Sequence, residues 1–229
     1  MPVISFANPK GGSGKTTLAM VLAQELAHQG SQVAVVDADP NAIIAKWAQA
    51  REDEGRAVPF KVVARPTEGE LVSTITELSK TYPFVLIDVE GTASRMVTRA
   101  FSRSNLVLVP LNPSPIDAGL AASAVKLIHE EGEALERQIP FRLVYSRVNA
   151  VIATKSYQRI SKAIDDAELP TLSTSLVERA AFRDIFDFGK TLQELTSSET
   201  SGLTQARENA FSVTQAVVDV LKELNGGPR

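Results

Sequence analysis

Short runs of consecutive apolar residues alternate along the chain with longer segments in which apolar residues recur every three or four positions. The runs predict buried strands at residues 3–7, 32–36, 60–64, 84–88, 105–110, 141–148 and 169–173. The longer segments predict helices at about 18–30, 42–54, 67–80, 92–103, 116–137, around 155–162 and at 203–224. Strands that alternate with helices in this way predict a doubly wound α/β fold with a mostly parallel sheet.

Individual residues refine these helices. Thr67 and Glu70 have the spacing of a capping box, and Ser114 followed by Pro115 predicts an N-cap and a first helical position. Apolar residues at helical spacing are expected to pack against the sheet, and they include Ile43, Ile44, Trp47, Phe211, Val217 and Leu221.

Composition places the chain among ordinary globular proteins. It has 229 residues, of which 44% are hydrophobic and 22% charged, which fits one domain over residues 1–229. The net charge of −3 means that any nucleic-acid site must be a local patch of cations. The absence of cysteine excludes disulfides and thiolate metal sites. Because no apolar run approaches the roughly 20 residues that span a bilayer and no signal peptide precedes the first strand, we expect a cytoplasmic protein with no membrane association.

A glycine-rich loop lies between the first predicted strand and the first predicted helix. Residues 8–17 read Asn-Pro-Lys-Gly-Gly-Ser-Gly-Lys-Thr-Thr. Glycines let successive backbone N–H groups face one anion, and the helix N-terminus adds partial positive charge. In such a loop Lys15 would reach the β- and γ-phosphates of a nucleotide, and the Thr16 hydroxyl would ligate Mg²⁺. Pro9 stands where the usual P-loop pattern has its first glycine, and Lys10 adds a second lysine at the mouth of the loop.

Carboxylates follow two of the predicted strands. The second strand ends in Asp37-Ala38-Asp39, and four apolar residues precede Asp88. The carboxyl ends of parallel strands lie where ligands bind in open α/β sheets. An apolar strand that ends in aspartate is typical of a Walker B motif, which places a carboxylate beside Mg²⁺. The sequence therefore predicts ATP and Mg²⁺ as ligands.

The run from Lys10 to Thr17 resembles the deviant Walker A motif of the ParA/MinD ATPases, and its spelling is most similar to the short ParF-like plasmid-partition proteins. The resemblance covers nearly the whole chain. It implies that two subunits form a homodimer around ATP, and that Lys10 of one subunit touches the phosphates held by the other. It also implies that Asp39 orients or activates the attacking water, while Asp37 supports the water shell of the metal.

The same resemblance assigns the remaining contacts. Catalysis would depend on Lys10, Lys15 and Asp39, and the metal on Thr16, Asp37 and Asp88. The phosphate contacts would come from Gly11, Gly12, Ser13, Gly14, Lys15, Thr16 and Thr17, and contacts near the base from Pro113, Arg147 and Asn149. This chain departs from the family pattern after Asp88, because Val89-Glu90-Gly91 replaces the common Thr-Pro-Pro.

Basic residues form candidate groups for a DNA surface. One group is a stripe at i, i+4 and i+8 of a predicted helix, and the others occur late in the chain. They are Arg95, Arg99 and Arg103, then Lys155, Arg159 and Lys162, and finally Arg183 and Lys190. Such spacing also fits a solvated helix face, and the sequence does not fix whether the groups converge.

These features favour a partition ATPase. In this hypothesis ATP drives dimerisation, the dimer binds nonspecific DNA at the nucleoid, and a ParB-type or other cargo-adaptor protein stimulates weak intrinsic hydrolysis. An alternative is a positioning or adaptor ATPase of the same family that acts on protein cargo, for example in conjugative transfer or polar localisation. A third hypothesis, a P-loop enzyme that phosphorylates a small molecule, is disfavoured by the two-lysine pattern.

Overall fold

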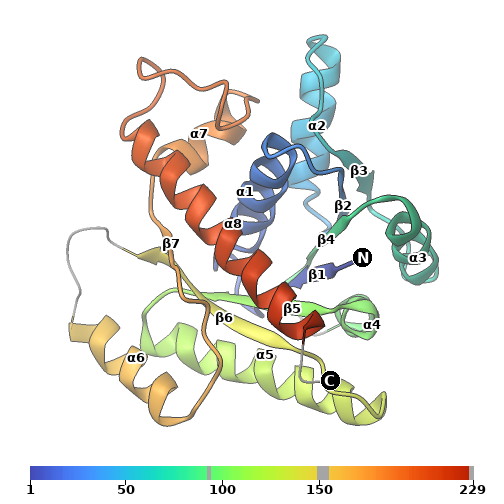
Figure 1. Cartoon of the computed structure of the whole chain (residues 1–229), viewed down its shortest axis with the longest axis vertical. Helices are drawn as coiled ribbons and strands as arrows, with labels where there is room; N and C mark the ends of the chain where they lie inside the picture. The colour runs from blue at the N-terminus through green and yellow to red at the C-terminus, as the bar shows by residue number, and fades with distance from the viewer. Residues whose placement is uncertain (92–93, 149–154, 227–229) are drawn as a thin grey trace.

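The computed structural model describes residues 1–91, 94–148 and 155–226. Its strands are β1 (Val3–Phe6), β2 (Val33–Ala38), β3 (Lys61–Ala64), β4 (Phe84–Val89), β5 (Leu106–Leu111), β6 (Phe141–Val148) and β7 (Leu176–Val177). Its helices are α1 (Lys15–His28), α2 (Ile43–Asp53), α3 (Leu71–Thr81), α4 (Arg95–Arg103), α5 (Pro115–Ala134), α6 (Lys155–Asp166), α7 (Ala181–Asp187) and α8 (Leu203–Asn225) (Figure 1).

All the strands join one parallel sheet in the order β3-β2-β4-β1-β5-β6-β7. The first strand therefore lies in the middle, with β4 and β5 as its neighbours. Because each strand enters the sheet in the same direction, the loops that follow β1, β2 and β4 meet at one edge. The doubly wound α/β prediction is confirmed.

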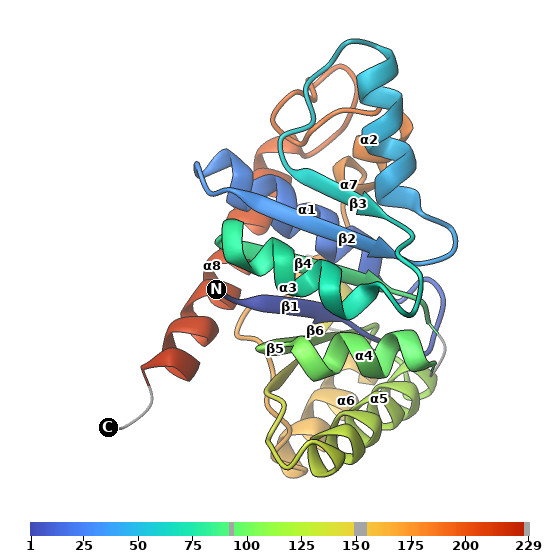
Figure 2. The ribbon, with the colours of Figure 1, turned by 90° about the vertical axis from the view of Figure 1, so that its right-hand side faces the viewer.

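Helices cover both faces of this sheet. Helices α1, α2, α7 and α8 pack on one face, and α3, α4, α5 and α6 pack on the other; Figure 2 shows α3, α4 and α5 in front of the strands with α1 and α8 behind. Side chains alternate between the two cores, so Ile4 and Phe6 of β1 join one core while Val3 joins the other. Burial on both faces explains why these strands are continuous apolar runs rather than alternating patterns.

Some predicted boundaries and faces are wrong. The last strand was expected at residues 169–173, but Thr171 makes only an isolated bridge to Leu143, and β7 comes later. The predicted helix at 92–103 begins at Arg95, because the Ser94 side chain accepts the N-cap hydrogen bond.

Two apolar side chains expected in the core are exposed. Phe211 is 50% exposed on α8, and Ile43 is 40% exposed on α2. Ile43 opens α2 beside the loop after β2, where its side chain lines a pocket described below rather than the core. The helix expected from Thr67 begins only at Leu71, so that boundary is wrong. The Glu70 carboxylate accepts from the Thr67 N–H, as a capping box requires, but the Thr67 hydroxyl also donates to this carboxylate and caps no backbone N–H of the described residues.

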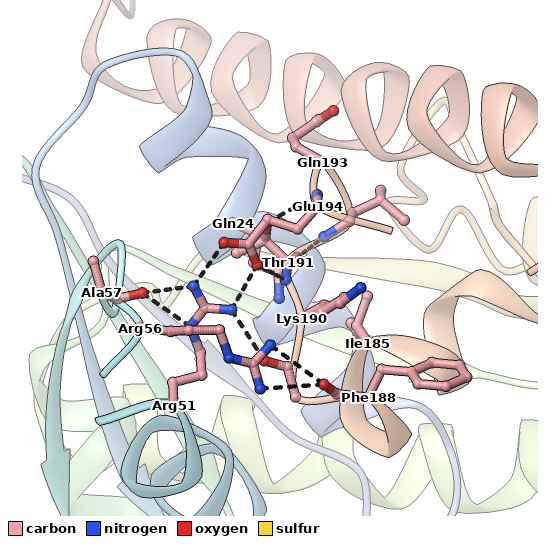
Figure 3. Close-up of polar contacts among 12 residues, drawn as sticks. Gln24, Arg51, Arg56, Ala57, Ile185, Phe188, Lys190, Thr191, Gln193 and Glu194 are labelled. Atoms are coloured by element: carbon pink, nitrogen blue, oxygen red, sulfur yellow. Dashed lines mark hydrogen bonds and ion pairs between the residues drawn. The ribbon is translucent and has the colours of Figure 1, made fainter. Parts of the chain in front are cut away.

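A buried arginine joins α2 to the segment that follows α7. The Arg51 side chain is 2% exposed; it donates to the Ala57 and Gly189 carbonyls and forms a bidentate ion pair with Glu194 (Figure 3). Its guanidinium also lies 5.0 Å from the centre of the Trp47 ring. The ion pair with Arg51 and the neighbouring N–H of Thr191 lower the pKa of Glu194 to about 2. This cluster fixes the C-terminal third of the chain against the N-terminal half.

Among the described residues, no helix is both long and apolar enough to cross a membrane.

Candidate functional site

The loop between β1 and α1 is folded as a cradle. Gly12 and Gly14 have φ values of +77° and +100°, a region that other residues rarely adopt. A β-carbon on Gly14 would also lie 3.3 Å from the Ser146 side chain on β6. The Ser146 hydroxyl donates to the Ser13 carbonyl at 2.6 Å and so ties the loop to the sheet. Glycine at position 14 is therefore required both by the backbone and by this close approach.

Asn8 fixes the entrance of the loop. Its side-chain amide donates to the Pro110 carbonyl at 2.8 Å, and its side-chain oxygen accepts from the Lys10 N–H at 2.8 Å. Asn8 is 2% exposed, so both bonds are shielded from water. The start of the loop is thereby anchored to the end of β5.

Lys15 is buried at the first position of α1. Its Nζ donates to the carbonyls of Asn8 and Lys10, at 3.0 and 3.2 Å. Burial lowers the pKa of Lys15, and the charges of Asp88 and Asp39 partly oppose that shift. An anion above the loop would meet a desolvated ammonium group that carbonyl oxygens already orient.

Asp37 and Asp88 lie opposite each other on the neighbouring strands β2 and β4. The Thr16 hydroxyl donates to Asp88 Oδ2 at 2.7 Å, and Asp37 Oδ2 accepts from the Ala45 N–H at 2.9 Å. The other oxygen of each carboxylate is buried without a hydrogen-bond partner. Burial raises the pKa of Asp37, and burial raises the pKa of Asp88 to about 7. Both carboxyl groups therefore have a raised pKa and one oxygen without a hydrogen-bond partner among the described residues. A hydrated divalent cation would stabilise their ionised forms.

A pocket of about 430 Å³, here called the phosphate pocket, opens above these groups. Gly91 forms part of its wall and lies so close to the loop that a β-carbon there would be 3.0 Å from the Pro9 carbonyl. Asp39 lines it as well, and its Oδ1 accepts from the Asn41 N–H. The lining residues are Pro9, Gly11, Gly12, Gly14, Lys15, Thr16, Thr17, Asp39, Pro40, Asn41, Ile43, Glu90, Gly91 and Arg147.

Lys10 has a partner within its own chain. Its Nζ lies 3.0 Å from Asp117 Oδ2 on α5, with 39% of the lysine side chain exposed and 2% of the aspartate side chain. The Ser114 hydroxyl donates to the same carboxylate oxygen, and the Asp117 N–H donates back to Ser114. The second lysine of the loop is therefore held beside α5 rather than over the phosphate pocket.

The sequence profile described as the VirC1 protein matches residues 1–224. The chain belongs to the VirC1 family. A relative named Protein ParA from Rhizobium radiobacter is 38% identical over 225 residues, which are 97% of this chain and 99% of that protein.

Solved structures support the same fold. Apo McdA from Cyanothece has a TM-score of 0.73 at 17% identity, and the match covers 95% of this chain and 99% of that one. A plasmid partition protein from Borrelia burgdorferi, solved with AMPPNP, has a TM-score of 0.71 at 14% identity over 96% and 99% of the two chains. This VirC1-family chain thus belongs with the ParA/MinD partition and positioning ATPases, as its Walker A spelling predicted.

Of the residues expected near a base, Arg147 lines a second, smaller pocket of about 120 Å³, here called the side pocket. Arg147 lines it together with Gly14 and Thr17 of the loop and with Leu176 and Phe182 from β7 and α7. Pro113 does not line either pocket; its carbonyl accepts from the Ser156 hydroxyl at 3.2 Å. Asn149 lies outside the described residues.

The basic groups differ in their pairing in this VirC1-family chain. Arg99 contacts the Glu68 carbonyl at 2.7 Å and its carboxylate at 3.4 Å. Arg183 pairs with Glu178 and Lys190 with Glu199, on the opposite face of the sheet from α4 and α6. Arg95 Nη1 lies 4.0 Å from Glu68 Oε1. The other exposed cations of these groups form no ion pair with the described residues, and they are Arg103, Lys155, Arg159 and Lys162.

Sequence reasoning missed three residues that shape the site. Asp117 receives Lys10, Ser146 holds the loop to β6, and Asn8 anchors it to β5. Only Asp117 had a local signal, because Ser114 and Asp117 have the spacing of a helix cap with an acidic third residue. Asn8 and Ser146 each bond to a residue more than 100 positions away in the sequence, and local sequence patterns do not predict such contacts.

Proposed function

We propose that this chain is an ATPase that binds ATP with Mg²⁺, dimerises in that state, binds DNA without base specificity and releases it after hydrolysis. The observation that carries the proposal is the convergence of Lys15, Thr16 and Asp88 on the glycine cradle, with two buried carboxylate oxygens left without partners. The residues fit a nucleoside triphosphate and a hydrated magnesium ion.

Each residue of the phosphate pocket has a distinct task in this proposal. When bound, Mg²⁺ would neutralise charge on the triphosphate, held by Thr16 and Asp88 with Asp37 contacting its water shell. Lys15 exchanges its carbonyl partners for phosphate oxygens. Asp39, at the end of β2 and on the wall of the pocket, orients the attacking water. Because phosphoryl transfer requires mainly positioning and charge neutralisation, these groups suffice for slow hydrolysis.

Lys10 is the residue that connects nucleotide binding to dimerisation in this proposal. Its side chain is 39% exposed and its ammonium group is paired with Asp117. In the dimer it leaves Asp117 and contacts the phosphates of the second subunit. The Asp117 side chain, in contrast, is 2% exposed, so the phosphates of the second subunit must offset the cost of leaving a buried carboxylate without its cation.

Helix α6 supports the DNA part of the proposal. Lys155, Arg159 and Lys162 are exposed there without an ion pair to the described residues. Arg99, Arg183 and Lys190 are partly neutralised by their own glutamates, so we assign them a smaller share of any phosphate contact.

The test combines sedimentation with DNA binding. With a nonhydrolysable ATP analogue and Mg²⁺, the wild type should sediment as a dimer, and Lys10→Ala should remain a monomer. DNA binding should require the triphosphate and should weaken steeply as salt increases. Binding that ignores nucleotide, or a wild type that stays monomeric at saturating analogue, contradicts the proposal.

A matched pair of triple variants locates the DNA surface. Reversing Lys155, Arg159 and Lys162 to glutamate should flatten the slope of log affinity against log salt by about 2–3. Reversing three exposed lysines elsewhere makes the same change in net charge and should leave the slope within about 1 of the wild type. The control set is Lys46, Lys80 and Lys126.

A second candidate is a positioning ATPase that binds a protein cargo. The pairing of Arg99, Arg183 and Lys190 with glutamates favours it, because these cations are less available to DNA phosphates. This candidate expects the α6 reversal to leave ATP-dependent dimerisation and cargo localisation intact. Loss of localisation together with DNA binding favours the first proposal.

A further inference from the structure

Arg147 has a backbone conformation that is unusual for a residue inside a strand. Its φ is +53°, in the left-handed region that side chains rarely adopt. Four other non-glycine residues in the described part of the chain have positive φ, and each of them lies outside the strands; Glu136 and Glu168, for example, end helices, where this conformation is usual. Arg147 alone among the five is inside a strand.

The strand is bulged at this residue. Ser146 pairs with Leu176, and Val148 pairs with Val177, so β6 takes two steps where β7 takes one. Arg147 is the extra residue. Bulges near binding sites redirect a side chain, and the left-handed backbone here is what a bulge of this kind requires.

The bulge directs the guanidinium to the glycine cradle. A β-carbon placed on Gly12 would be 4.0 Å from Arg147 Nη1. The Ser146 hydroxyl, one residue earlier, is bonded to the Ser13 carbonyl and keeps this part of β6 against the loop. Among the described residues, no carboxylate forms an ion pair with Arg147.

Arg147 also lies where the two pockets meet. Gly14, Thr17 and Arg147 line both the phosphate pocket and the side pocket. The side pocket combines the apolar side chains of Leu176 and Phe182 with charged residues, and the phosphate pocket contains Lys15 and Thr16. The charged lining residues of the side pocket besides Arg147 are Glu178, Arg179 and Arg183. A nucleotide with its phosphates in one pocket and its nucleoside in the other must pass the guanidinium at the joint between them.

We propose that Arg147 is a phosphate-binding residue that contacts the α- and β-phosphates of the nucleotide from within the same subunit, and that the strained bulge in β6 exists to hold it there. This inference rests on the proposed nucleotide site, but it assigns Arg147 to the phosphates rather than to the base. Unpartnered charge, a strained backbone and a shared position between two pockets converge on this role.

The experiment measures nucleotide affinity by titration calorimetry for wild type, Arg147→Gly and Arg147→Lys. Glycine accepts the positive φ without strain, so Arg147→Gly removes the guanidinium and should fold at least as stably as the wild type. We expect its affinity for ADP and for ATP to fall by about tenfold or more, by similar factors, and the salt dependence of ADP binding to become shallower. Arg147→Lys keeps the charge and should recover part of the loss.

The control is Arg142→Ala, which removes an arginine at the other end of the same strand and should leave both affinities unchanged. Equal affinities in wild type and Arg147→Gly overturn the inference. A loss confined to ATP assigns Arg147 to the γ-phosphate or to the second subunit instead, and a loss with unchanged salt dependence assigns it to the nucleoside; both results also overturn it. If the wild type itself binds neither nucleotide, the proposed function fails before this inference is reached.

Discussion

Replacing Asp88 by asparagine should stabilise the protein while abolishing the proposed Mg²⁺-dependent hydrolysis of ATP. Asp88 is 1% exposed, and burial raises its pKa to about 7 from the ordinary value of 3.8. At 1.36 kcal/mol for each pKa unit, the ionised form is disfavoured in the folded protein by about 4 kcal/mol. Asparagine removes this charge and keeps an oxygen that accepts the Thr16 hydroxyl.

Part of that gain is cancelled in the variant. The new amide group places a buried N–H donor where Asp88 Oδ1 has no partner, which costs about 1–3 kcal/mol. The net stabilisation above pH 7 is therefore about 2 kcal/mol. For a domain of this size, that corresponds to an increase in Tm of about 4–8 °C.

The pH dependence separates this explanation from a simple packing effect. Because the folded-state pKa is raised, wild-type stability falls as pH rises from about 4 to about 7, while the asparagine variant has no such loss. At pH 4 only the cost of the amide donor remains, so the asparagine variant should melt below the wild type there. The order should reverse as pH rises between 4 and 7, and the advantage of the variant should be constant above pH 7.

Thermal unfolding from pH 4 to 8, in chelator and without nucleotide, measures this difference. The control Asp187→Asn changes an exposed carboxylate on α7 and should give a difference that varies little with pH. A variant that melts below the wild type at pH 8, or a stabilisation equal at pH 4 and pH 8, refutes the reasoning.

Three further outcomes can be checked on the same protein. Asp117→Asn removes the carboxylate that holds Lys10 within its own chain, so the ATP-dependent dimer should tighten about fivefold or more in analytical ultracentrifugation. A weaker dimer would show that the Lys10–Asp117 pair does not compete with dimerisation. Arg51→Ala leaves buried acceptors unpaired and should lower the free energy of unfolding, measured in urea, by about 3–5 kcal/mol. The control Lys46→Ala, on the exposed side of α2, should change it by no more than about 0.5 kcal/mol. Similar values for the two variants would show that Arg51 does not join the two segments. The Mg²⁺ concentration that half-activates hydrolysis should rise as pH falls below about 7, because protons compete for Asp88, and a pH-independent value would place the metal elsewhere.

Local sequence patterns predicted most of the fold because most of its helices and strands contain their own apolar run, apolar periodicity or helix cap. Continuous apolar runs gave the buried strands, and the Ser114-Pro115 pair marked the start of α5 as observed. The last strand was misplaced because β7 has only two residues, too few for any periodic signal. Phe211 was misplaced because helical spacing identifies a face but not whether another element covers it.

The candidate site divides in the same way. Lys15, Thr16 and Asp88 belong to compact motifs, so the sequence predicted that they would meet, and in the structure they do. The bond from Ser146 to Ser13 and the Arg51–Glu194 pair depend on which strands and loops become neighbours, which no local pattern encodes. The roles assigned to all of the site residues, including Lys10, Lys15 and Asp39, stay predictions.

The central place of β1 has a consequence for synthesis on the ribosome. Val3 pairs with Val85, and Ile4 pairs with Leu106. Strand β1 therefore cannot pair until residues about 80 and 100 positions later have been synthesised. The loop after it is anchored to Pro110 only once β5 has emerged. A nascent chain shorter than this has the Walker A sequence but no cradle to hold a nucleotide, and the ability to bind one should arise abruptly when the middle of the sheet closes.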